Sequence, residues 1–263
     1  MKHFAVIGDP ISQSLSPVLH NEVYYQLGIK ASFEKIRVQP HALSEFMATH
    51  QLDGFNVTIP HKQTVLPFLD KIDEAAKMIG AVNCIFGNIG YNTDWIGFKK
   101  ALQLNHVDLN GKACLILGAG GAARAIAYSL IQSGVSSISV NNRTQSKADE
   151  LLDWIQSFSP NIIKTKSPEI IANCTPVGMW PDIDSSPNYN INKNHILIDT
   201  IYNPIETKWL KIGNELGAKT VSGLDMFIAQ GLASMDVWFE EAISEKVNID
   251  LCKSVLRQAL DSV

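Results

Sequence analysis

A strand, a glycine-rich turn and a helix follow one another between residues 113 and 132, and this unit constrains the fold more than any other segment. The apolar run Ala-Cys-Leu-Ile-Leu at residues 113–117 is too short for a helix and predicts a buried strand. The fingerprint Gly118-x-Gly120-x-x-Ala123 follows, and a helical pattern comes next. Strands alternating with helices are typical of a mostly parallel sheet with helices on its faces, so the chain is expected to be an α/β protein.

The small residues of this turn each have a physical task in binding a dinucleotide. Gly118 allows a tight turn out of the strand, Gly120 lets the backbone approach a pyrophosphate, and Ala123 lets helix and strand pack closely. The helix N-terminus offers unpaired N–H groups to the phosphates. Such turns also occur as plain strand–helix corners, but a second strand expected at residues 137–141 completes the dinucleotide-binding unit. The sequence therefore predicts a dinucleotide site at this turn.

Two cations follow the second expected strand, where a site for NAD usually has an acidic residue that binds the ribose 2′-hydroxyl. This chain has Arg143, Thr144 and Lys147 instead. A guanidinium can hold a 2′-phosphate through paired hydrogen bonds, whereas a carboxylate would repel it. The alternative is that both cations are solvated charges at the start of a helix. Together with the glycine turn, the pattern favours NADP.

The charge balance argues against nucleic acid as a partner. The 263 residues carry 22 Lys and Arg against 26 Asp and Glu, a formal net charge of −4, so no basic excess can neutralise a phosphate backbone. At about 150 residues per domain, this length predicts two domains. Anionic ligands would have to be held by locally placed groups.

The cysteines and the apolar segments predict a soluble, cytoplasmic protein that binds no membrane. The four cysteines are widely spaced and form no Cys-x-x-Cys pair, which favours buried free thiols in a reducing compartment. The N-terminus has no signal-peptide pattern. No segment approaches the ~20 apolar residues of a membrane helix. No metal site is predicted.

In the first half of the chain, polar residues gather where strands end. Strands are expected at residues 4–7, 33–38 and 54–57, and helices at residues 17–27 and 42–49. Ser14 and Ser16 lie before the first helix, where two hydroxyls at a helix N-terminus suit a small carboxylate. The alternative is that Ser16 only serves as the N-cap, with Pro17 at the first helical position.

Three further polar residues are ambiguous when each is taken alone. Lys62 could be an ordinary exposed lysine, and Asp94 could be an ordinary acid at the start of a helix over residues 94–104. Asn83 lies at the end of an apolar segment. Together they supply an ammonium, a carboxylate and an amide, which suits a polar hydroxylated acid.

The motifs of this chain, taken in order, resemble those of the shikimate dehydrogenases over nearly the whole length. The matching segments are residues 14–17 (Ser-Leu-Ser-Pro), 56–62 (Asn-Val-Thr-Ile-Pro-His-Lys), 80–83 (Gly-Ala-Val-Asn), 92–94 (Asn-Thr-Asp), 118–122 (Gly-Ala-Gly-Gly-Ala), 142–144 (Asn-Arg-Thr), 173–179 (Asn-Cys-Thr-Pro-Val-Gly-Met), 202–204 (Tyr-Asn-Pro) and 230–231 (Gln-Gly). So many short motifs in one order form a far more specific signal than the glycine turn alone.

The resemblance implies an enzyme that reversibly reduces 3-dehydroshikimate to shikimate with NADPH, on the way to aromatic amino acids. It implies Lys62 as acid/base, assisted by Asp94. By similarity, the substrate contacts are Ser14, Ser16, Thr58, Asn83, Asp94, Tyr202 and Gln230. By similarity, the cofactor contacts are Gly118, Ala119, Gly120, Gly121, Ala122, Asn142, Arg143, Thr144, Lys147, Thr200 and Gly223.

The residue chemistry agrees with this reaction. Hydride transfer to a ketone creates an alkoxide, and a cationic Lys62 can donate the proton that neutralises it. Asp94 within reach would orient the ammonium. The residues leave open which of the two groups titrates in the rate profile.

The resemblance also implies two domains separated by a cleft. The expected domains are an N-terminal α/β substrate domain over residues 1–100, completed by C-terminal helices over residues 237–263, and a Rossmann-like NADP-binding domain over residues 101–236. A monomer or a homodimer is expected.

Three features depart from the family pattern. Trp95 stands where glycine is common, and Cys174 stands where a second threonine is common. The segment over residues 157–170 is short for a helix followed by a strand, which predicts a truncated or irregular element. Two alternative functions stay open: a quinate/shikimate dehydrogenase with broader substrate choice and NAD use, and a non-catalytic NADP-binding sensor.

Overall fold

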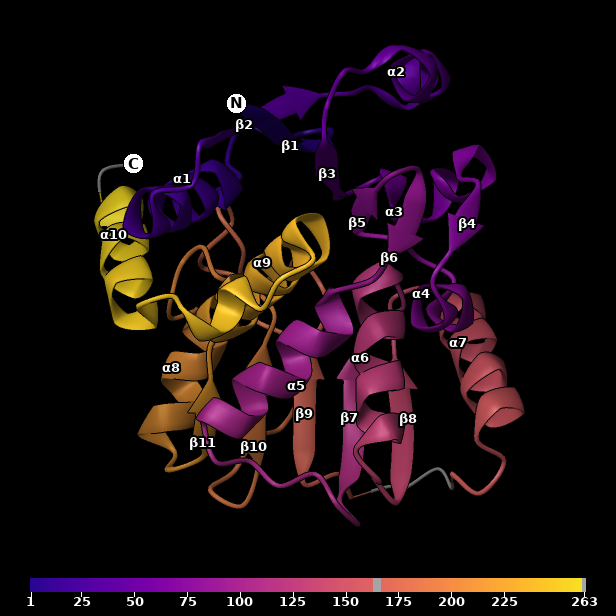
Figure 1. The fold of residues 1–263 in the computed structure, drawn as a ribbon. Coiled ribbons are helices and arrows are strands. Elements are labelled where there is room, and N and C mark those ends of the chain that lie inside the picture. Colours follow the sequence, from indigo (N-terminus) through magenta and orange to yellow (C-terminus); the bar gives the residue numbers. More distant parts are fainter. Residues whose placement is uncertain (163–166, 262–263) are drawn as a thin grey trace. The chain divides into compact units, whose positions relative to one another are not determined.

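The computed structural model describes residues 1–162 and 167–261 and divides the chain into two compact units (Figure 1). Unit 1 comprises Met1–Ile96 and Ile228–Val263, and unit 2 comprises Gly97–Phe227. The chain passes from one unit to the other within two helices, α5 (Asp94–Leu104) and α9 (Gly223–Phe239). Each unit has its own sheet, and the expected α/β class is confirmed.

Unit 1 contains a mixed sheet of six strands in the order β2-β1-β3-β5-β6-β4. Its strands are β1 (Lys2–Gly8), β2 (Ala31–Arg37), β3 (Gly54–Val57), β4 (Lys71–Ile72), β5 (Cys84–Phe86) and β6 (Ile89–Tyr91). Its helices, besides its parts of α5 and α9, are α1 (Ser16–Leu27), α2 (Leu43–Thr49), α3 (His61–Thr64), α4 (Glu74–Ile79) and α10 (Ile249–Asp261). Strand β1 pairs in parallel with β2 and β3, whereas β5 runs antiparallel to β3 and β6.

The longer elements of unit 1 match the sequence prediction within two residues at each end, whereas β4, β5 and β6 were not predicted. Each of these three strands has only two or three residues, too few to show a periodic pattern. They matter for the site because β5 places the residues before it beside the end of β3, through the pairing of Asn56 with Cys84.

The C-terminal part of α9 supplies core residues to unit 1. The Trp238 ring stacks on Phe4 of β1 with centroids 4.7 Å apart, and its Nε1–H donates to the carbonyl of Ile85 on β5 at 3.1 Å. Trp238 is among the largest fully buried side chains. Chain segments more than 200 residues apart therefore share one core.

Unit 2 contains a parallel sheet of five strands in the order β11-β10-β9-β7-β8. Its strands are β7 (Ala113–Leu117), β8 (Ser137–Asn141), β9 (Ile170–Asn173), β10 (Ile196–Asp199) and β11 (Lys219–Val221). Its helices, besides its parts of α5 and α9, are α6 (Gly121–Gln132), α7 (Gln145–Phe158) and α8 (Lys208–Glu215). Strand order reverses at β7, and open α/β sheets bind ligands beyond the carboxyl ends of the strands at such a point.

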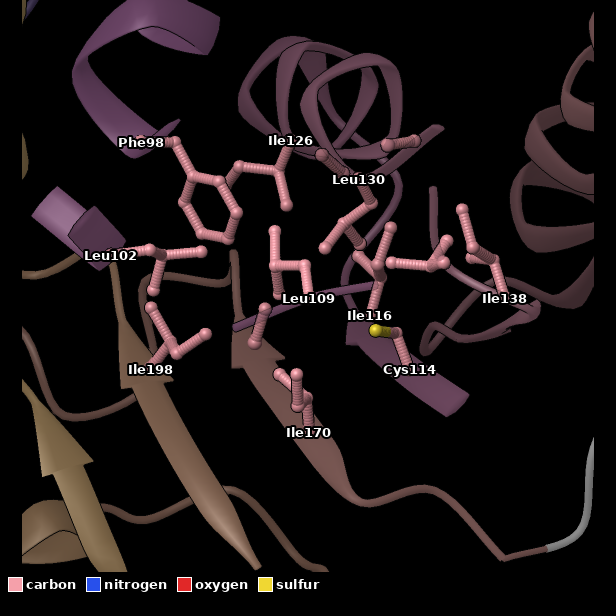
Figure 2. Close-up of a cluster of buried hydrophobic side chains, with 14 of the residues drawn as sticks. Phe98, Leu102, Leu109, Cys114, Ile116, Ile126, Leu130, Ile138, Ile170 and Ile198 are labelled. Atoms are coloured by element: carbon pink, nitrogen blue, oxygen red, sulfur yellow. The ribbon is translucent and has the colours of Figure 1, made fainter. Parts of the chain in front are cut away.

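One apolar cluster holds α5 and α6 against this sheet (Figure 2). Phe98 of α5 and Ile126 of α6 face Ile116 of β7 and Ile198 of β10, and all four side chains are almost completely buried. Leu109, from the segment between α5 and β7, joins the same cluster. At about 25 cal/mol per Å² of apolar area, such burial anchors the turn that follows β7.

Two further predictions concern the rest of the chain. The expected irregular element over residues 157–170 falls partly on residues 163–166, which lie outside the described residues. All four cysteines lie in the described ranges and are free thiols, as predicted; Cys84, Cys114 and Cys252 are buried. Among the described residues, no helix is both long enough and apolar enough to cross a membrane.

Candidate active site and cofactor site

The central feature of unit 1 is an ion pair between Lys62 and Asp94. The Lys62 Nζ lies 2.6 Å from the Asp94 Oδ2, with side chains 18% and 8% exposed. Lys62 lies on the single turn α3 and Asp94 is the first residue of α5. A short contact between a partly shielded ammonium and a buried carboxylate orients the lysine more firmly than an exposed pair could.

Neighbouring amides hold both members of this pair in place. The side-chain Nδ2 of Asn83 donates to the Asp94 Oδ1 at 2.8 Å, so both oxygens of the carboxylate are used. The backbone N–H of Asp94 donates to the Asn92 Oδ1 at 3.1 Å, which satisfies one donor at the start of α5. The backbone N–H of Val82 donates to the Lys62 carbonyl at 2.7 Å.

Asn83 also contacts Thr93 and Gln230. Its Oδ1 accepts from the Thr93 backbone N–H at 2.6 Å, and its Nδ2 lies 3.4 Å from the Gln230 Oε1. Gln230 belongs to α9, so a residue late in the chain reaches the Lys62–Asp94 ion pair through Asn83. The structure therefore brings together Lys62, Asn83, Asp94 and Gln230 of the predicted site.

Ser14 and Ser16 lie together at the start of α1. The Ser14 hydroxyl donates to the Ser16 Oγ at 3.2 Å and accepts from the Ser16 backbone N–H at 3.3 Å. The prediction of Ser16 as N-cap is wrong, because Leu15 holds the cap position and Ser16 is the first helical residue. Pro17 is therefore the second helical residue, whereas the sequence predicted it as the first. Ser14 instead satisfies a backbone donor of the first turn, so its hydroxyl forms the local contact expected of Ser16.

Thr58 follows β3 at the same sheet edge from which the serine segment leaves β1. Strands β1 and β3 are parallel and Ile7 pairs with Val57, so their carboxyl ends coincide. The Thr58 backbone N–H donates to the Ile7 carbonyl at 2.9 Å. Asn83 joins this edge because its carbonyl accepts from the Val57 N–H at 2.9 Å.

In unit 2, the turn after β7 has the geometry of a phosphate-binding loop. Gly118 has φ +110°, and a Cβ there would lie 3.0 Å from the carbonyl oxygen of Cys174, so only glycine fits. A Cβ on Gly120 would meet no atom within 4 Å, so the backbone at Gly120 faces open space. In the described part of the chain, no side chain caps α6, which starts at Gly121 and includes Ala122. Its first N–H groups are therefore available to an anion.

The end of β8 presents the predicted cations to solvent. Arg143, Thr144 and Lys147 are all exposed, while Asn142 is half-buried and its Nδ2 donates to the Thr144 carbonyl at 2.9 Å. Neither cation forms an ion pair within the described ranges. The residues present thus fit an NADP adenosine with a 2′-phosphate.

Three other predicted contacts lie in unit 2, between β10 and α9. The Thr200 hydroxyl donates to the Asn173 carbonyl at 2.9 Å. A Cβ on Gly223 would lie 2.4 Å from the carbonyl oxygen of Ile201, so the close approach of the backbone alone requires glycine there. The ring of Tyr202 stacks on Phe227 at 4.2 Å.

The comparisons with known proteins identify the family. The model "Shikimate dehydrogenase substrate binding domain" matches residues 6–85, and the model "Shikimate / quinate 5-dehydrogenase" matches residues 99–174. A curated shikimate dehydrogenase (NADP(+)) of Bacillus cereus is 41% identical, and the match covers 89% of this chain and 91% of that protein. This chain belongs to the shikimate dehydrogenase family.

Solved structures of the family have the same fold. A shikimate dehydrogenase crystallised in complex with NADP+ is 34% identical, with a TM-score of 0.89 over 99% of this chain and 96% of that one. The enzyme of Thermus thermophilus, solved with NADP(H) and shikimate, is 30% identical, with a TM-score of 0.87 over 98% of this chain and 100% of that one. The expectation of a substrate domain followed by a Rossmann-like domain is confirmed.

One buried carboxylate of this family member was not singled out from its sequence. Asp199, at the end of β10, accepts hydrogen bonds from the Asn173 Nδ2 at 3.1 Å, the Ile201 N–H at 3.0 Å and the Thr207 Oγ1 at 2.8 Å. Burial raises the pKa of Asp199 to about 6, although these three donors oppose the shift. The network fixes the segment that carries Thr200 and Tyr202.

Sequence reasoning also missed Ser234, which is completely buried on α9. Its signal in the sequence is slight: it is a serine four residues after Gln230 on an apolar helix, a spacing that puts both on one face. Of the departures from the family pattern, Trp95 is half-buried beside Asp94 on α5, and Cys174 lies half-buried against Gly118.

Proposed function

We propose that this chain is an NADP-dependent shikimate dehydrogenase that reversibly reduces 3-dehydroshikimate to shikimate. The observation that carries the proposal is the 2.6 Å contact between the Lys62 Nζ and the Asp94 Oδ2, with Asn83 on the other carboxylate oxygen. Family membership and the NADP-binding relatives support the same reaction. The product serves the synthesis of aromatic amino acids.

Lys62 is the catalytic acid in the direction of reduction. Bound NADPH supplies the hydride, and negative charge then develops on the oxygen of the reduced carbonyl. The ammonium of Lys62 donates a proton to that oxygen, and Asp94 keeps the ammonium oriented. In the direction of oxidation, a neutral Lys62 accepts the proton from the substrate hydroxyl. The pair thus stabilises charge where it develops, while the hydride chemistry belongs to the cofactor.

Polar groups around this pair bind a hydroxylated carboxylic acid. We assign Ser14 and Ser16 to the substrate carboxylate, because they combine two hydroxyls with the N-terminus of α1. Thr58 and Asn83 contact ring hydroxyls from the shared edge of β1 and β3. Gln230 completes the contacts that unit 1 makes to the substrate, and the role of Tyr202 rests on the family resemblance alone.

Unit 2 holds the cofactor. The N–H groups at the start of α6 bind the pyrophosphate, and the missing side chain at Gly120 leaves room for it. Arg143 and Lys147 bind the 2′-phosphate. Asn142 and Thr144 shape the same loop, and Thr200 and Gly223 face the nicotinamide end. Unit 1 is then the substrate domain and unit 2 the NADP domain. The free thiols fit a reducing compartment, and we place the enzyme in the cytoplasm.

A second candidate is a quinate/shikimate dehydrogenase that also uses NAD, because one matching family model is described for both substrates. The exposed cations after β8 favour NADP over NAD. Quinate differs from shikimate at the ring carbon that bears the carboxylate, next to the proposed serine contacts.

A steady-state assay of the purified chain with each substrate and each cofactor tests both candidates. The proposal predicts a kcat/KM for shikimate with NADP at least tenfold above that for quinate or for NAD. Comparable values for quinate and NAD would favour the second candidate. A chain that binds NADPH and reduces no dehydroshikimate would be a cofactor-binding sensor.

A further inference from the structure

Ser234 of α9 connects three segments of unit 1 that are far apart in the sequence. Its hydroxyl donates to the Gln230 carbonyl at 3.0 Å and accepts from the Asn56 Nδ2 at 2.8 Å. Its Oγ also lies 3.1 Å from the Thr93 Oγ1, and because the single Ser234 hydroxyl proton is donated to Gln230, Thr93 is the donor of this hydrogen bond. One buried side chain therefore links α9 to β3 and to the residue that precedes Asp94.

Two of the three partners of Ser234, Thr93 and Asn56, lead through Asn83 to the proposed catalytic pair. The Thr93 Oγ1 accepts from the Asn83 Nδ2 at 3.0 Å, and the same Nδ2 donates to Asp94. The Asn56 Nδ2 donates to the Asn83 carbonyl at 3.0 Å as well as to Ser234. Ser234 thus reaches Asn83 by two independent routes.

The orientation of Asn56 depends on Ser234 to an unusual degree. Its Oδ1 is buried and has no hydrogen-bond partner among the described residues, so only the Nδ2 holds the side chain. Without the Ser234 acceptor, one of the two bonds of this buried amide is lost. Buried polar networks tolerate such losses poorly, because a low-dielectric interior offers no substitute partner.

We propose that Ser234 is a positioning residue for the Lys62–Asp94 pair. It acts through Thr93 and Asn56 on Asn83, which in turn holds the Asp94 carboxylate at the distance where it orients the Lys62 ammonium. A serine in a helix often does no more than bond the carbonyl four residues earlier. Here that bond is one of three, and the other two reach the catalytic pair. The inference rests on the proposed roles of Lys62 and Asp94.

The test compares Ser234→Ala with a matched control, Ser129→Ala. Ser129 is also completely buried in a helix, α6 of unit 2, and its Oγ has no hydrogen-bond partner among the described residues. The measurements are kcat and KM with shikimate, the Kd of NADPH and the Tm. We expect Ser234→Ala to lower kcat about tenfold at unchanged NADPH affinity, and Ser129→Ala to leave kcat unchanged.

A variant of Thr93, the hydrogen-bond partner of Ser234, provides a second test of the same contact. Thr93→Val removes the second hydroxyl and retains the shape of the side chain. If the hydroxyls of Ser234 and Thr93 act through their mutual contact, the double variant Ser234→Ala/Thr93→Val has nearly the same kcat as Thr93→Val alone. If Ser234→Ala does not fold, Ser234→Cys replaces it, because a thiol nearly keeps the size of the side chain and is a weak hydrogen-bond donor and acceptor. A roughly tenfold loss of kcat in folded Ser234→Cys supports the proposal, and an unchanged kcat overturns it.

Two results separate the failure of this inference from the failure of the proposed function. A lower Tm with an unchanged kcat in folded Ser234→Ala would show a purely structural hydroxyl and overturn the inference. Lys62→Ala, assayed in the same series, must lose at least about a hundredfold in kcat in any case if the proposed function holds. Full turnover by Lys62→Ala would remove the proposed catalytic pair, and the positioning role with it.

Discussion

The two proposed binding regions of this chain consist of different chemical groups. In unit 1, side chains hold one another: Lys62, Asp94 and Asn83 form a partly buried network in which nearly every polar atom has a protein partner. In unit 2, the cofactor region consists of backbone at Gly118 and Gly120 and of exposed cations that pair with no described carboxylate. The first region is organised before a ligand arrives, whereas the second leaves its donors free for phosphates.

This difference follows from what each region has to do. In the proposed reaction a proton passes between Lys62 and one substrate oxygen, which requires a fixed ammonium and therefore a network around it. A dinucleotide is a long anion, and N–H groups at a helix start with mobile cations can hold it without such a network. Substitutions in unit 1 should therefore change turnover, and substitutions in unit 2 should change cofactor affinity.

The largest expected effect is that of Lys62→Ala on turnover. Loss of the general acid should lower kcat by about 10²–10⁴-fold, because Lys62 is the only cation paired with Asp94 among the described residues. Steady-state rates with shikimate and NADP measure this. Lys77→Ala, an exposed lysine of α4 in the same unit, is the control and should retain full activity. A Lys62→Ala enzyme within tenfold of the unmodified chain would disprove the acid/base assignment.

Substitutions at the two glycines of the turn after β7 should have different effects, one on stability and the other on cofactor binding. Gly120→Ala should keep the Tm, because its Cβ meets nothing within 4 Å, and should weaken NADPH binding by about 10–100-fold, because the methyl occupies the phosphate approach. Gly118→Ala should instead lower stability by roughly 1–3 kcal/mol, owing to its positive φ and the Cys174 carbonyl. Fluorescence titration with NADPH and thermal unfolding provide the two readouts. Equal loss of Tm in both variants would contradict this distinction.

Arg143→Ala tests the discrimination between cofactors. Loss of the paired hydrogen bonds to the 2′-phosphate should raise the Kd of NADP about 10–100-fold and leave that of NAD nearly unchanged. Calorimetric titration with both cofactors measures the ratio. Lys211→Ala, an exposed lysine of α8, controls for the loss of one positive charge in unit 2. Equal losses for the two cofactors would refute the phosphate assignment.

The last expected effect is on stability alone and concerns Asp199 and pH. Its pKa is raised from 3.8 to about 6, so between about pH 4 and 6 the folded chain holds more protons than the unfolded chain, and its stability falls as the pH rises. Asp199→Asn should remove this component, which amounts to about 3 kcal/mol. Urea unfolding at several pH values measures it. The control is Asp182→Asn, at an exposed position. If the stability of Asp199→Asn changes with pH as steeply as that of the unmodified chain, the raised pKa of Asp199 is contradicted.

The sequence predicted the cofactor region of unit 2 from its residues, because the chemistry there is local. The roles proposed for Gly118, Gly120 and Arg143 depend on backbone geometry and charge within one strand–turn–helix unit, and such a unit can be recognised in a single window. The same holds for the long strands and helices, whose apolar patterns are strong. The short strands β4 to β6 have too few residues to form a pattern.

The catalytic region of unit 1 could be predicted only through the family resemblance. Lys62 and Asp94 are 32 residues apart, and each has an ordinary explanation when taken alone. Ser234 was not predicted, since its role arises from contacts with Asn56 and Thr93 that exist only after the chain has folded. The prediction for the start of α1 was wrong for a similar reason. Whether the hydroxyl of Ser14 or that of Ser16 accepts from the first turn depends on the exact path of the backbone.

The most direct test of the division between the two regions is the affinity of Lys62→Ala for NADPH. If unit 1 supplies the proton and unit 2 holds the cofactor, the Kd of this inactive variant, measured by fluorescence titration, lies within about twofold of that of the unmodified chain. A Kd raised tenfold or more would show that Lys62 contributes to cofactor binding, and would contradict the separation of catalysis from cofactor binding proposed for this chain.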